Sequence, residues 1–449
     1  MSMPVWLKDK LFLQETLSYK DKLFLTLAGR VDGATNFDVD NRANFYPKIS
    51  GSYVISDGYS SKEGAIIKSA RIRASYGEAG NLTAISPFER FGSYSPNDFL
   101  DSSTLQQNSR LGNESLTPER TKEFEIGTDL SLFNDRASFL FTYYKQDIED
   151  LIVERVLAPS IGGSTRTENV GTMENIGIEM YTRITPIKTE DLVWNLNFNY
   201  SNNKNKVLST IGGTISIPTV SGANPVIQEG QPLGVFYGTY FATDENGANL
   251  LTGASSTGAP EGVPQVERGD LSTGQSMRDE NGQPTGDILR KVIGDPNPDY
   301  ILGMGTDIAY KNFNFSMLWE AVIGFDIFDA DKRTRQGVGL GSLAEQELSG
   351  ALPRGYIAGI YPIEEFRMED GSFVKLREVS MSYNFPTLLG SKLRDFKISI
   401  IGRNLISFDN FFSYDPETNA GGQSNLLRAV NFGNVPIPKT FALSLSANF

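Results

Sequence analysis

Two short acidic segments carry the side chains that come closest to a metal-binding pattern. The members are Asp32, Asn36, Asp38 and Asp40 in the first segment, and Asp326, Asp329 and Asp331 in the second. Carboxylate and amide oxygens are the ligands that calcium prefers in proteins. The first segment departs from the EF-hand pattern, because it has Arg42 and no glycine where that loop must turn. A solvated loop is therefore the preferred interpretation of both segments, and no metal site is predicted.

Three other motifs could carry chemistry. Residues 337–341 are glycine-rich like a phosphate-binding loop, but they follow no strand-to-helix unit, so a loop without a ligand is favoured. Residues 268–270 form the Arg-Gly-Asp tripeptide that integrins bind, and chance accounts for it in so long a loop. Aspartate and glutamate are common enough to allow a glycosidase-type carboxylate pair, yet the sequence singles out no pair.

The absence of histidine and cysteine narrows the chemistry further. Without histidine the chain has no Ser-His-Asp or Cys-His catalysis and no imidazole metal ligand. An outer-membrane hydrolase is a weak alternative for the same reason, since no histidine activates a nucleophile. The formal net charge of -13 argues against a nucleic-acid partner, because phosphate binding needs clustered Lys and Arg. The sequence predicts no enzyme activity, no catalytic residue and no cofactor.

Aromatic side chains on two long loops are the preferred candidates for ligand contact. They are Phe236, Tyr237, Tyr240 and Phe241 in one loop, and Phe408, Phe411, Phe412 and Tyr414 in the last loop. Rings beside polar groups suit sugar faces, peptide side chains or a docked partner lid. Packing of the loops against one another explains the same rings equally well, so both interpretations stay open.

Alternation of apolar and polar residues indicates the elements that carry these loops. Residues 123–132 and 194–200 place apolar side chains on one face and polar ones on the other, as strands between lipid and water require. Scoring by this period gives about thirteen strands. The expected strands are 11–19, 22–31, 45–55, 66–77, 123–132, 137–146, 176–186, 194–200, 299–310, 313–323, 373–385, 395–404 and 440–449.

The connections between these strands indicate the fold class. Short turns at 19–22, 133–136, 186–191 and 310–313 alternate with long segments. The long segments are 78–121, 147–175, 204–298, 324–372 and 405–439. Outer-membrane barrels have short periplasmic turns and long extracellular loops, whereas a soluble sandwich has loops of more even length. We therefore predict an all-β fold, an antiparallel transmembrane β-barrel segment integral to a bacterial outer membrane.

Rings near the strand ends fit the same plan, since aromatic girdles mark the boundary between lipid and water. They are Tyr143, Tyr144, Trp194, Tyr200, Tyr310, Phe313 and Tyr383. Packing in a sandwich core is the alternative explanation for each ring.

The last strand bears a barrel-assembly signal. Apolar residues from Phe441 to Phe449 occupy every odd position, and a C-terminal aromatic residue is typical of outer-membrane barrels. An odd number of antiparallel strands cannot close on itself, and an open edge in lipid leaves backbone groups unpaired. We therefore expect further strands ahead of Met1, and no signal peptide is recognisable at this N-terminus.

Several phrases together resemble one family, the SusC/RagA-like TonB-dependent outer-membrane transporters of Bacteroidota. The phrases are residues 19–26, 30–33, 46–52, 72–81, 116–121, 175–179, 294–300, 370–377, 402–405 and 414–417, in the family order. The resemblance implies a barrel of about 22 strands with an N-terminal plug. Residues 1–449 match only the C-terminal barrel half of such a protein, and no plug or TonB box is recognisable.

The resemblance also implies a function and partners. Residues 1–449 would be the wall of an importer of large nutrients, glycans or peptides, embedded in outer-membrane lipid. A SusD-like surface lipoprotein would close over the mouth, a plug-bearing portion or separate chain would complete the barrel, and TonB would act through the plug. The alternative is a stand-alone barrel that serves as an adhesin or structural scaffold. The identity of the substrate is beyond the sequence.

Overall fold

The computed structural model describes residues 8–55, 66–81, 85–86, 88–99, 102–219, 222–253, 261–388, 393–424 and 426–448. One antiparallel sheet of 13 strands dominates these residues, and its strands lie side by side in chain order. Its members are β1 (Lys8–Tyr19), β2 (Leu23–Ala34), β3 (Ala43–Val54), β4 (Ile67–Asn81), β8 (Glu119–Leu132), β9 (Ala137–Glu149), β12 (Gly171–Lys188), β13 (Leu192–Thr210), β22 (Tyr300–Tyr310), β23 (Phe313–Ile323), β26 (Phe373–Leu388), β27 (Leu393–Asp409) and β29 (Thr440–Asn448). Each corresponds to one predicted strand, so the predicted fold class is confirmed.

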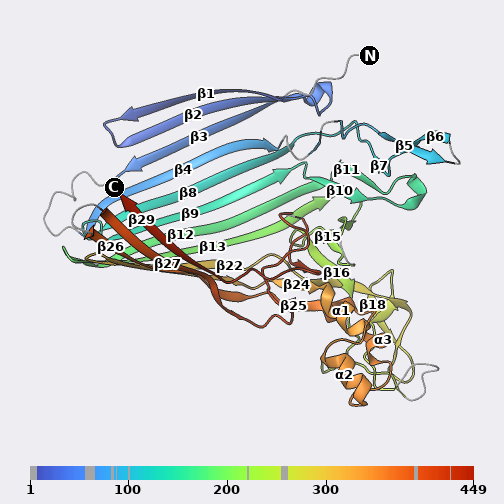
Figure 1. Ribbon diagram of the computed structural model, residues 1–449. Coiled ribbons are helices and arrows are strands. Elements are labelled where there is room, and N and C mark those ends of the chain that lie inside the picture. The colour runs from blue at the N-terminus through green and yellow to red at the C-terminus, as the bar shows by residue number, and fades with distance from the viewer. Residues whose placement is uncertain are drawn as a thin grey trace.

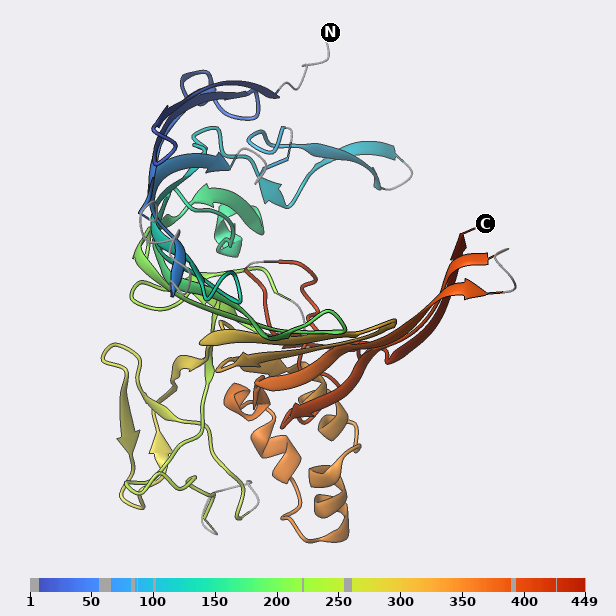
Figure 2. The same ribbon diagram turned by 90° about the vertical axis from the view of Figure 1, so that its left-hand side faces the viewer.

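The sheet is curved and open. Figure 2 shows it bent into a trough whose first and last strands, β1 and β29, stand apart. Within the described residues, β1 pairs only with β2 and β29 pairs only with β27. Both edges therefore present unpaired backbone donors and acceptors.

The two ends of the sheet differ as the loop lengths predict. Figure 1 shows the short turns together at one end of the strands and the long connections at the other. Lys20 and Asp21 both have φ of 52°, and Lys22 N donates to Tyr19 O over 3.1 Å, which makes a tight hairpin turn. Asn134, at φ 55°, lies in the turn between β8 and β9, where asparagine tolerates the left-handed conformation.

Strand register assigns every side chain of the sheet to one of two faces. One row of neighbours across six strands consists of Leu443, Ile400, Met381, Phe315, Ile308 and Trp194. The adjacent row consists of Ser444, Ser399, Ser382 and Asn314. We call these the apolar face and the polar face. Phe441, Leu443 and Leu445 on the apolar face are 76%, 67% and 62% exposed, as side chains in contact with lipid would be.

The predicted girdle rings fall mostly on the apolar face. Six of the seven share register rows with apolar neighbours, for example Tyr383 beside Phe313 and Phe313 beside Tyr310. Tyr144 is the exception, because its hydroxyl donates to Asn203 Oδ1 on the polar face over 3.2 Å. For each ring, strand register shows which face of the sheet the side chain lies on, which the sequence alone does not decide.

The long connections are more ordered than expected. The sequence predicts loops for these segments, but the structure shows that they contain small sheets and helices, which the sequence does not predict. Their strands are β5 (Tyr94–Phe99), β6 (Ser102–Gln107), β7 (Arg110–Leu111), β10 (Ile152–Val156), β11 (Thr165–Asn169), β14 (Ile215–Ser216), β15 (Pro225–Ile227), β16 (Val235–Thr239), β17 (Arg268–Asp270), β18 (Gln275–Arg278), β19 (Pro284–Thr285), β20 (Asp287–Ile288), β21 (Arg290–Gly294), β24 (Asp326–Asp329), β25 (Met368–Asp370) and β28 (Val430–Asn431). Most are too short for periodicity to detect.

Within the described residues, all helices except η1, which lies between β2 and β3, belong to the same long connections. They are α1 (Ala330–Gly337), α2 (Ser342–Ser349), α3 (Tyr356–Ile360) and the 3-10 turns η1 (Val39–Asn41), η2 (Pro159–Ile161) and η3 (Glu364–Arg367). The glycine-rich segment 337–341 is the turn between α1 and α2, not a phosphate loop. Among the residues described, no helix is both long enough and apolar enough to span a membrane.

The hydrophobic cores lie among these connections and the adjoining strand ends. One contains Val153, Val207 and Ile227, and a second contains Phe37 and Leu116. A third core, built around Phe236, Phe328, Ala330 and Val430, joins three separate long connections. The middle of the sheet contributes little to any of them, since neither of its faces is covered by a second layer of the described chain.

Insertion of a charge on each face of the sheet tests the assignment of the apolar face and the polar face. Leu443→Arg places a guanidinium on the apolar face and is expected to destabilise the membrane-inserted sheet by about 2–4 kcal/mol, because lipid does not solvate it. Ser444→Arg, one residue on, faces the polar side and serves as the matched control. Denaturant unfolding in lipid vesicles measures both. Equal losses for the two variants would contradict the assignment of faces.

Candidate functional site

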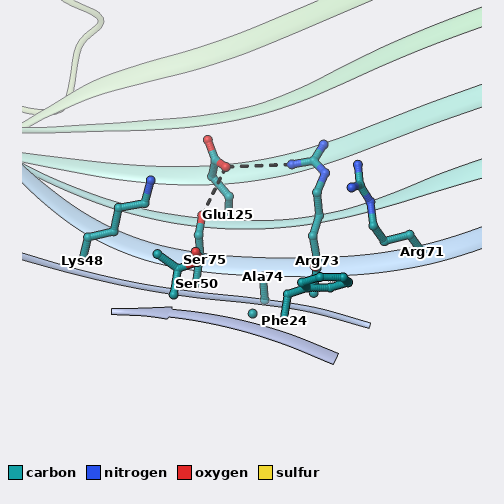
Figure 3. Close-up of a pocket in the computed structure, with 11 residues that line it drawn as sticks. Phe24, Lys48, Ser50, Arg71, Arg73, Ala74, Ser75 and Glu125 are labelled. Carbon is teal, nitrogen blue, oxygen red and sulfur yellow. Dashed lines mark hydrogen bonds and ion pairs between the residues drawn. The ribbon is translucent and has the colours of Figure 1, made fainter. Parts of the chain in front are cut away.

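A polar hollow of about 260 Å³ lies on the polar face where β2, β3, β4 and β8 meet. Figure 3 shows its side chains projecting from these neighbouring strands toward a shared space. The charged and hydroxyl members are Lys48, Ser50, Ser52, Arg71, Arg73, Ser75 and Glu125, with Phe24 at one side. They share this space because period-2 alternation and register bring residues of one parity to one face.

Ion pairs connect the walls of the hollow. Arg71 Nε donates to Asp129 Oδ2 over 2.7 Å, and Arg73 Nε lies 3.4 Å from Asp129 Oδ1. Ser75 Oγ donates to Glu125 Oε2 over 3.3 Å, and Arg73 lies 3.9 Å from the same carboxylate.

The charges of the hollow favour acidic groups. Lys48 completes a set of three cations against the two carboxylates of Glu125 and Asp129. No hydrogen bond or ion pair to the Lys48 amino group is seen within the described part of the chain. The arrangement is suited to hold an acidic or hydroxyl-bearing surface by charge and hydrogen bonding.

A second ionic cluster fastens the last long connection to the sheet. Lys375 is 5% exposed, and its Nζ lies 2.5 Å from Asp415 Oδ1 and 3.1 Å from Glu417 Oε2. Arg377 donates to both Glu417 oxygens over 2.6 and 2.8 Å and also pairs with Glu320. Residues 370–377 and 414–417, two phrases of the family resemblance, therefore meet in space.

A β-bulge positions this cluster. Arg377 has no register partner in either neighbouring strand, because the ladder steps from Leu376 to Glu378 on both sides of β26. The extra residue shifts the alternation of β26, so that Lys375 and Glu378, three residues apart, lie opposite Glu320 and Leu318 on one face of the sheet.

The cluster also shifts the acidities of its carboxyl groups. Burial alone would raise the pKa of Asp415, but hydrogen bonds from Lys375 and from backbone N–H groups outweigh it and lower the pKa. Burial likewise opposes the ionised form of Glu417, yet Arg377 and Lys375 hold its pKa below the ordinary value.

The eight candidate rings do not form one patch. Phe236 is fully buried against Phe328, with ring centroids 5.7 Å apart, so its side chain packs the loops. Phe411 is also buried. Phe408 is exposed, but it stacks on Trp319, which pairs with Met304 of the apolar face. For these three rings the structure supports packing or lipid contact in place of ligand contact.

The other five rings lie at or near the loop surface. Lys291 Nζ lies 4.2 Å from the ring centroid of Tyr240, a half-buried residue. Tyr237 and Phe241 are half-buried beside it, and Phe241 N donates to Glu365 over 2.8 Å.

Among the candidate rings that follow β27, Phe412 and Tyr414 are exposed. The guanidinium of Arg335 lies 4.9 Å from the Tyr414 ring, and Lys332 Nζ lies 5.7 Å from the Phe412 ring. These two exposed rings, each beside a cation of α1, are therefore better placed to contact a ligand or partner than the three half-buried rings of the other loop.

The acidic segments are engaged within the protein. Asp32 is buried and pairs with Arg30 over 2.8 Å, whereas Asp38 is exposed and pairs with Arg90. Asp329 caps α1 by accepting from two backbone N–H groups. Across the described ranges, no group of three or more Asp or Glu residues is arranged to hold a metal ion.

The Arg-Gly-Asp tripeptide, Asp326 and Asp331 also form hydrogen bonds within the protein. Arg268–Asp270 form β17 of a small hairpin, where Asp270 accepts from Ser272, so the tripeptide is part of an ordered sheet. Asp326 accepts from Asp295 N over 2.9 Å, and Asp331 accepts from Gly433 N over 2.8 Å.

Of the two residues of the predicted assembly signal, the structure describes only one. Phe441 is highly exposed on the apolar face of β29. Phe449 lies outside the residues that the structure describes. The assembly signal therefore stays a prediction.

Sequence reasoning missed both ionic clusters. The polar positions of each alternating strand, for instance Arg71, Arg73 and Ser75, are visible in the sequence. Alternation shows that they share one face of their strand, but not which polar residues of other strands lie beside them. Which polar residues become neighbours depends on register between strands far apart in sequence, such as β4 and β8.

A family model described as "TonB dependent receptor-like, beta-barrel" matches residues 7–283 of the chain. TonB-dependent receptor P3 of Formosa agariphila is 29% identical over 458 residues, covering 96% of this chain and 44% of the relative. TonB-dependent receptor SusC of Bacteroides thetaiotaomicron is 23% identical over 464 residues, covering 96% and 43%. The chain thus spans less than half the length of these relatives.

Solved structures share the fold. The structure titled "Structure of the RagAB peptide transporter" superposes with a TM-score of 0.77 at 18% identity, covering 98% of this chain and 47% of that one. Its "open-open" state gives a TM-score of 0.76 at 16% identity. At such identities the likeness establishes the architecture of the sheet and its connections.

The ionic cluster generates a prediction about the last connection. Asp415→Asn leaves buried Lys375 with one carboxylate. The variant is expected to destabilise the packing of residues 410–439 against the sheet by about 3 kcal/mol. Amide hydrogen exchange within that segment measures the loss. Asp409→Asn, at an exposed carboxylate nearby, is the control. Unchanged exchange in the Asp415 variant would contradict the role of the cluster.

The same cluster predicts a pH dependence. Folding lowers the pKa of Asp415 and Glu417 from ordinary values of 3.8 and 4.5. Their contribution is therefore complete at neutral pH and is lost as the pH falls below those values toward the lowered ones. Protection factors for amide exchange in residues 410–439, corrected for the intrinsic rate at each pH, should fall in that acidic range in the wild type, and less so in Asp415→Asn.

Proposed function

The chain belongs to the TonB-dependent receptor family, whose members are integral proteins of the outer membrane, and from that premise we propose that it forms the C-terminal barrel wall of an importer of large nutrients, glycans or peptides. The observation that carries the proposal is a sheet with one exposed apolar face, one ionic face and ordered connections gathered at one end. A wall of this kind separates lipid from a polar passage.

The open sheet supports a larger assembly. Edge strands β1 and β29 present unpaired backbone groups, each of which costs several kcal/mol at lipid depth. We infer that further strands and a plug, in the same protein or in a separate chain, complete the barrel. The polar hollow beside Lys48 and Arg73 would then face the plug or the cargo. TonB would act through the plug and would not contact this wall.

The ordered connections support a partner at the mouth. We propose that a SusD-like lipoprotein docks on the long-loop end, where Phe412 and Tyr414 present exposed rings beside cations of α1. Tryptophan, tyrosine and arginine are over-represented among the residues that dominate binding between proteins. Glycans and peptides are both retained as cargo, since either suits a polar passage. Transport of this kind requires no catalytic group from the chain.

Isolation of the intact assembly tests the proposal. The chain, with whatever protein surrounds it naturally, is purified from outer membranes through an affinity tag and analysed by native mass spectrometry. An importer should carry a plug-bearing portion and a surface lipoprotein, and deletion of its gene should abolish uptake of a fluorescent glycan or peptide pool. An assembly that carries neither component would support the adhesin or scaffold alternative and overturn the importer.

Paired variants localise the partner in the same preparation. Replacement of Phe412 and Tyr414 by alanine should lower lipoprotein capture by about tenfold, because loss of central interface rings costs more than about 1 kcal/mol. Tyr414→Phe keeps the ring and should retain capture. Full capture by the double alanine variant would remove these rings from the docking surface while leaving the importer proposal intact.

A further inference from the structure

Two arginines approach each other in the long connections without an acidic partner in the described residues. Arg333 lies on α1 and Arg367 ends η3, and Arg367 is only 2% exposed. Nε and Nη1 of Arg367 and Nε of Arg333 are buried and have no hydrogen-bond partner among the described residues. A buried charged donor without a partner is strongly destabilising, so a native protein normally satisfies it.

The two guanidinium groups converge on one exposed position. A Cβ built on Gly222 would lie 3.4 Å from Arg367 Nη1 and 3.8 Å from Arg333 Nη2. Gly222 itself is exposed, and Arg333 is only partly buried. The donors therefore meet beside an exposed position of the backbone.

Packing fixes both side chains. The Arg333 guanidinium lies 4.4 Å from the ring centroid of Tyr361, and the Arg367 guanidinium lies 5.1 Å from that of Phe328. Phe328 belongs to the core that joins three connections, so the Arg367 head group cannot simply turn outward.

Among the described residues, no carboxylate forms an ion pair with Arg333 or Arg367. Glu364 attracts Arg367, but its Oε2 already accepts from Thr239 N and Arg290 Nη1, each over 2.9 Å. Burial, and then repulsion from Arg333, lowers the pKa of Arg367 to about 10. Acidic residues outnumber basic ones by 54 to 41, so an unpaired pair of cations does not reflect a shortage of carboxylates.

We propose that Arg333 and Arg367 form a binding site for one compact oxyanion, a sulfate, phosphate or carboxylate group, which enters beside Gly222. Guanidinium groups present forked donors that match the oxygens of such anions, and two of them neutralise its charge. The anion would satisfy the orphan donors and relieve the repulsion between the arginines. This site is independent of the proposed transport function, because it requires neither cargo nor lipoprotein.

Equilibrium dialysis of the detergent-solubilised full assembly against radiolabelled sulfate, and separately against radiolabelled phosphate, tests the site. The wild type should bind one anion per chain saturably. Arg333→Gln and Arg367→Gln should each weaken binding by about tenfold or more, since each removes charge-assisted hydrogen bonds. Competition by acetate shows whether a planar carboxylate also occupies the site.

Arg354→Gln is the matched control. Arg354 is an exposed arginine of the same long connection, between α2 and α3, so anion binding should be unchanged. Heat-modifiable gel mobility checks that each variant is folded. If Arg367→Gln fails to fold, the partly exposed Arg333→Gln decides the outcome. Absence of saturable binding by the wild type, or equal binding by all three variants, would overturn the proposal.

Discussion

The pairing of backbone groups within one continuous sheet is the constraint on which the rest of this structure depends. A strand that contacts lipid finds no water for its N–H and C=O groups, so neighbouring strands must satisfy them. The thirteen strands meet this demand by pairing antiparallel in chain order, and the register then fixes which side chains face lipid. The row from Leu443 to Trp194 and the adjacent serine row follow from that pairing.

A sheet with lipid on one face and a polar passage on the other has no covered core, so cohesion must come from elsewhere. In this chain it comes from the long connections and strand ends, where small cores such as that around Phe236 and Phe328 join segments far apart in sequence. Ionic contacts add to them, notably the buried pair of Lys375 and Asp415. The order of the connections therefore matters as much as the sheet, because these cores and ionic contacts lie there.

The sequence predicted the sheet well and the sites poorly, for physical reasons. Alternation is a local property, so β13 was found from residues 194–200 alone, although it extends to Thr210 beyond the clearest part of the pattern. Phe236 and Tyr414 are both loop aromatics with another ring within two residues in the sequence, but one is buried and the other exposed. That difference depends on contacts across the fold, as does the meeting of Arg333 with Arg367, and composition cannot reveal either.

Site-directed spin labelling along β29 and β13 tests the central claim, that strand register gives this outer-membrane wall one lipid face and one polar face. The chain has no cysteine, so each introduced cysteine carries the only label. Labels at positions 441, 443 and 445 should be accessible to oxygen dissolved in lipid, and labels at 442, 444 and 446 to a water-soluble nickel complex, with the same alternation along 194–200. Uniform accessibility along either strand would contradict the account.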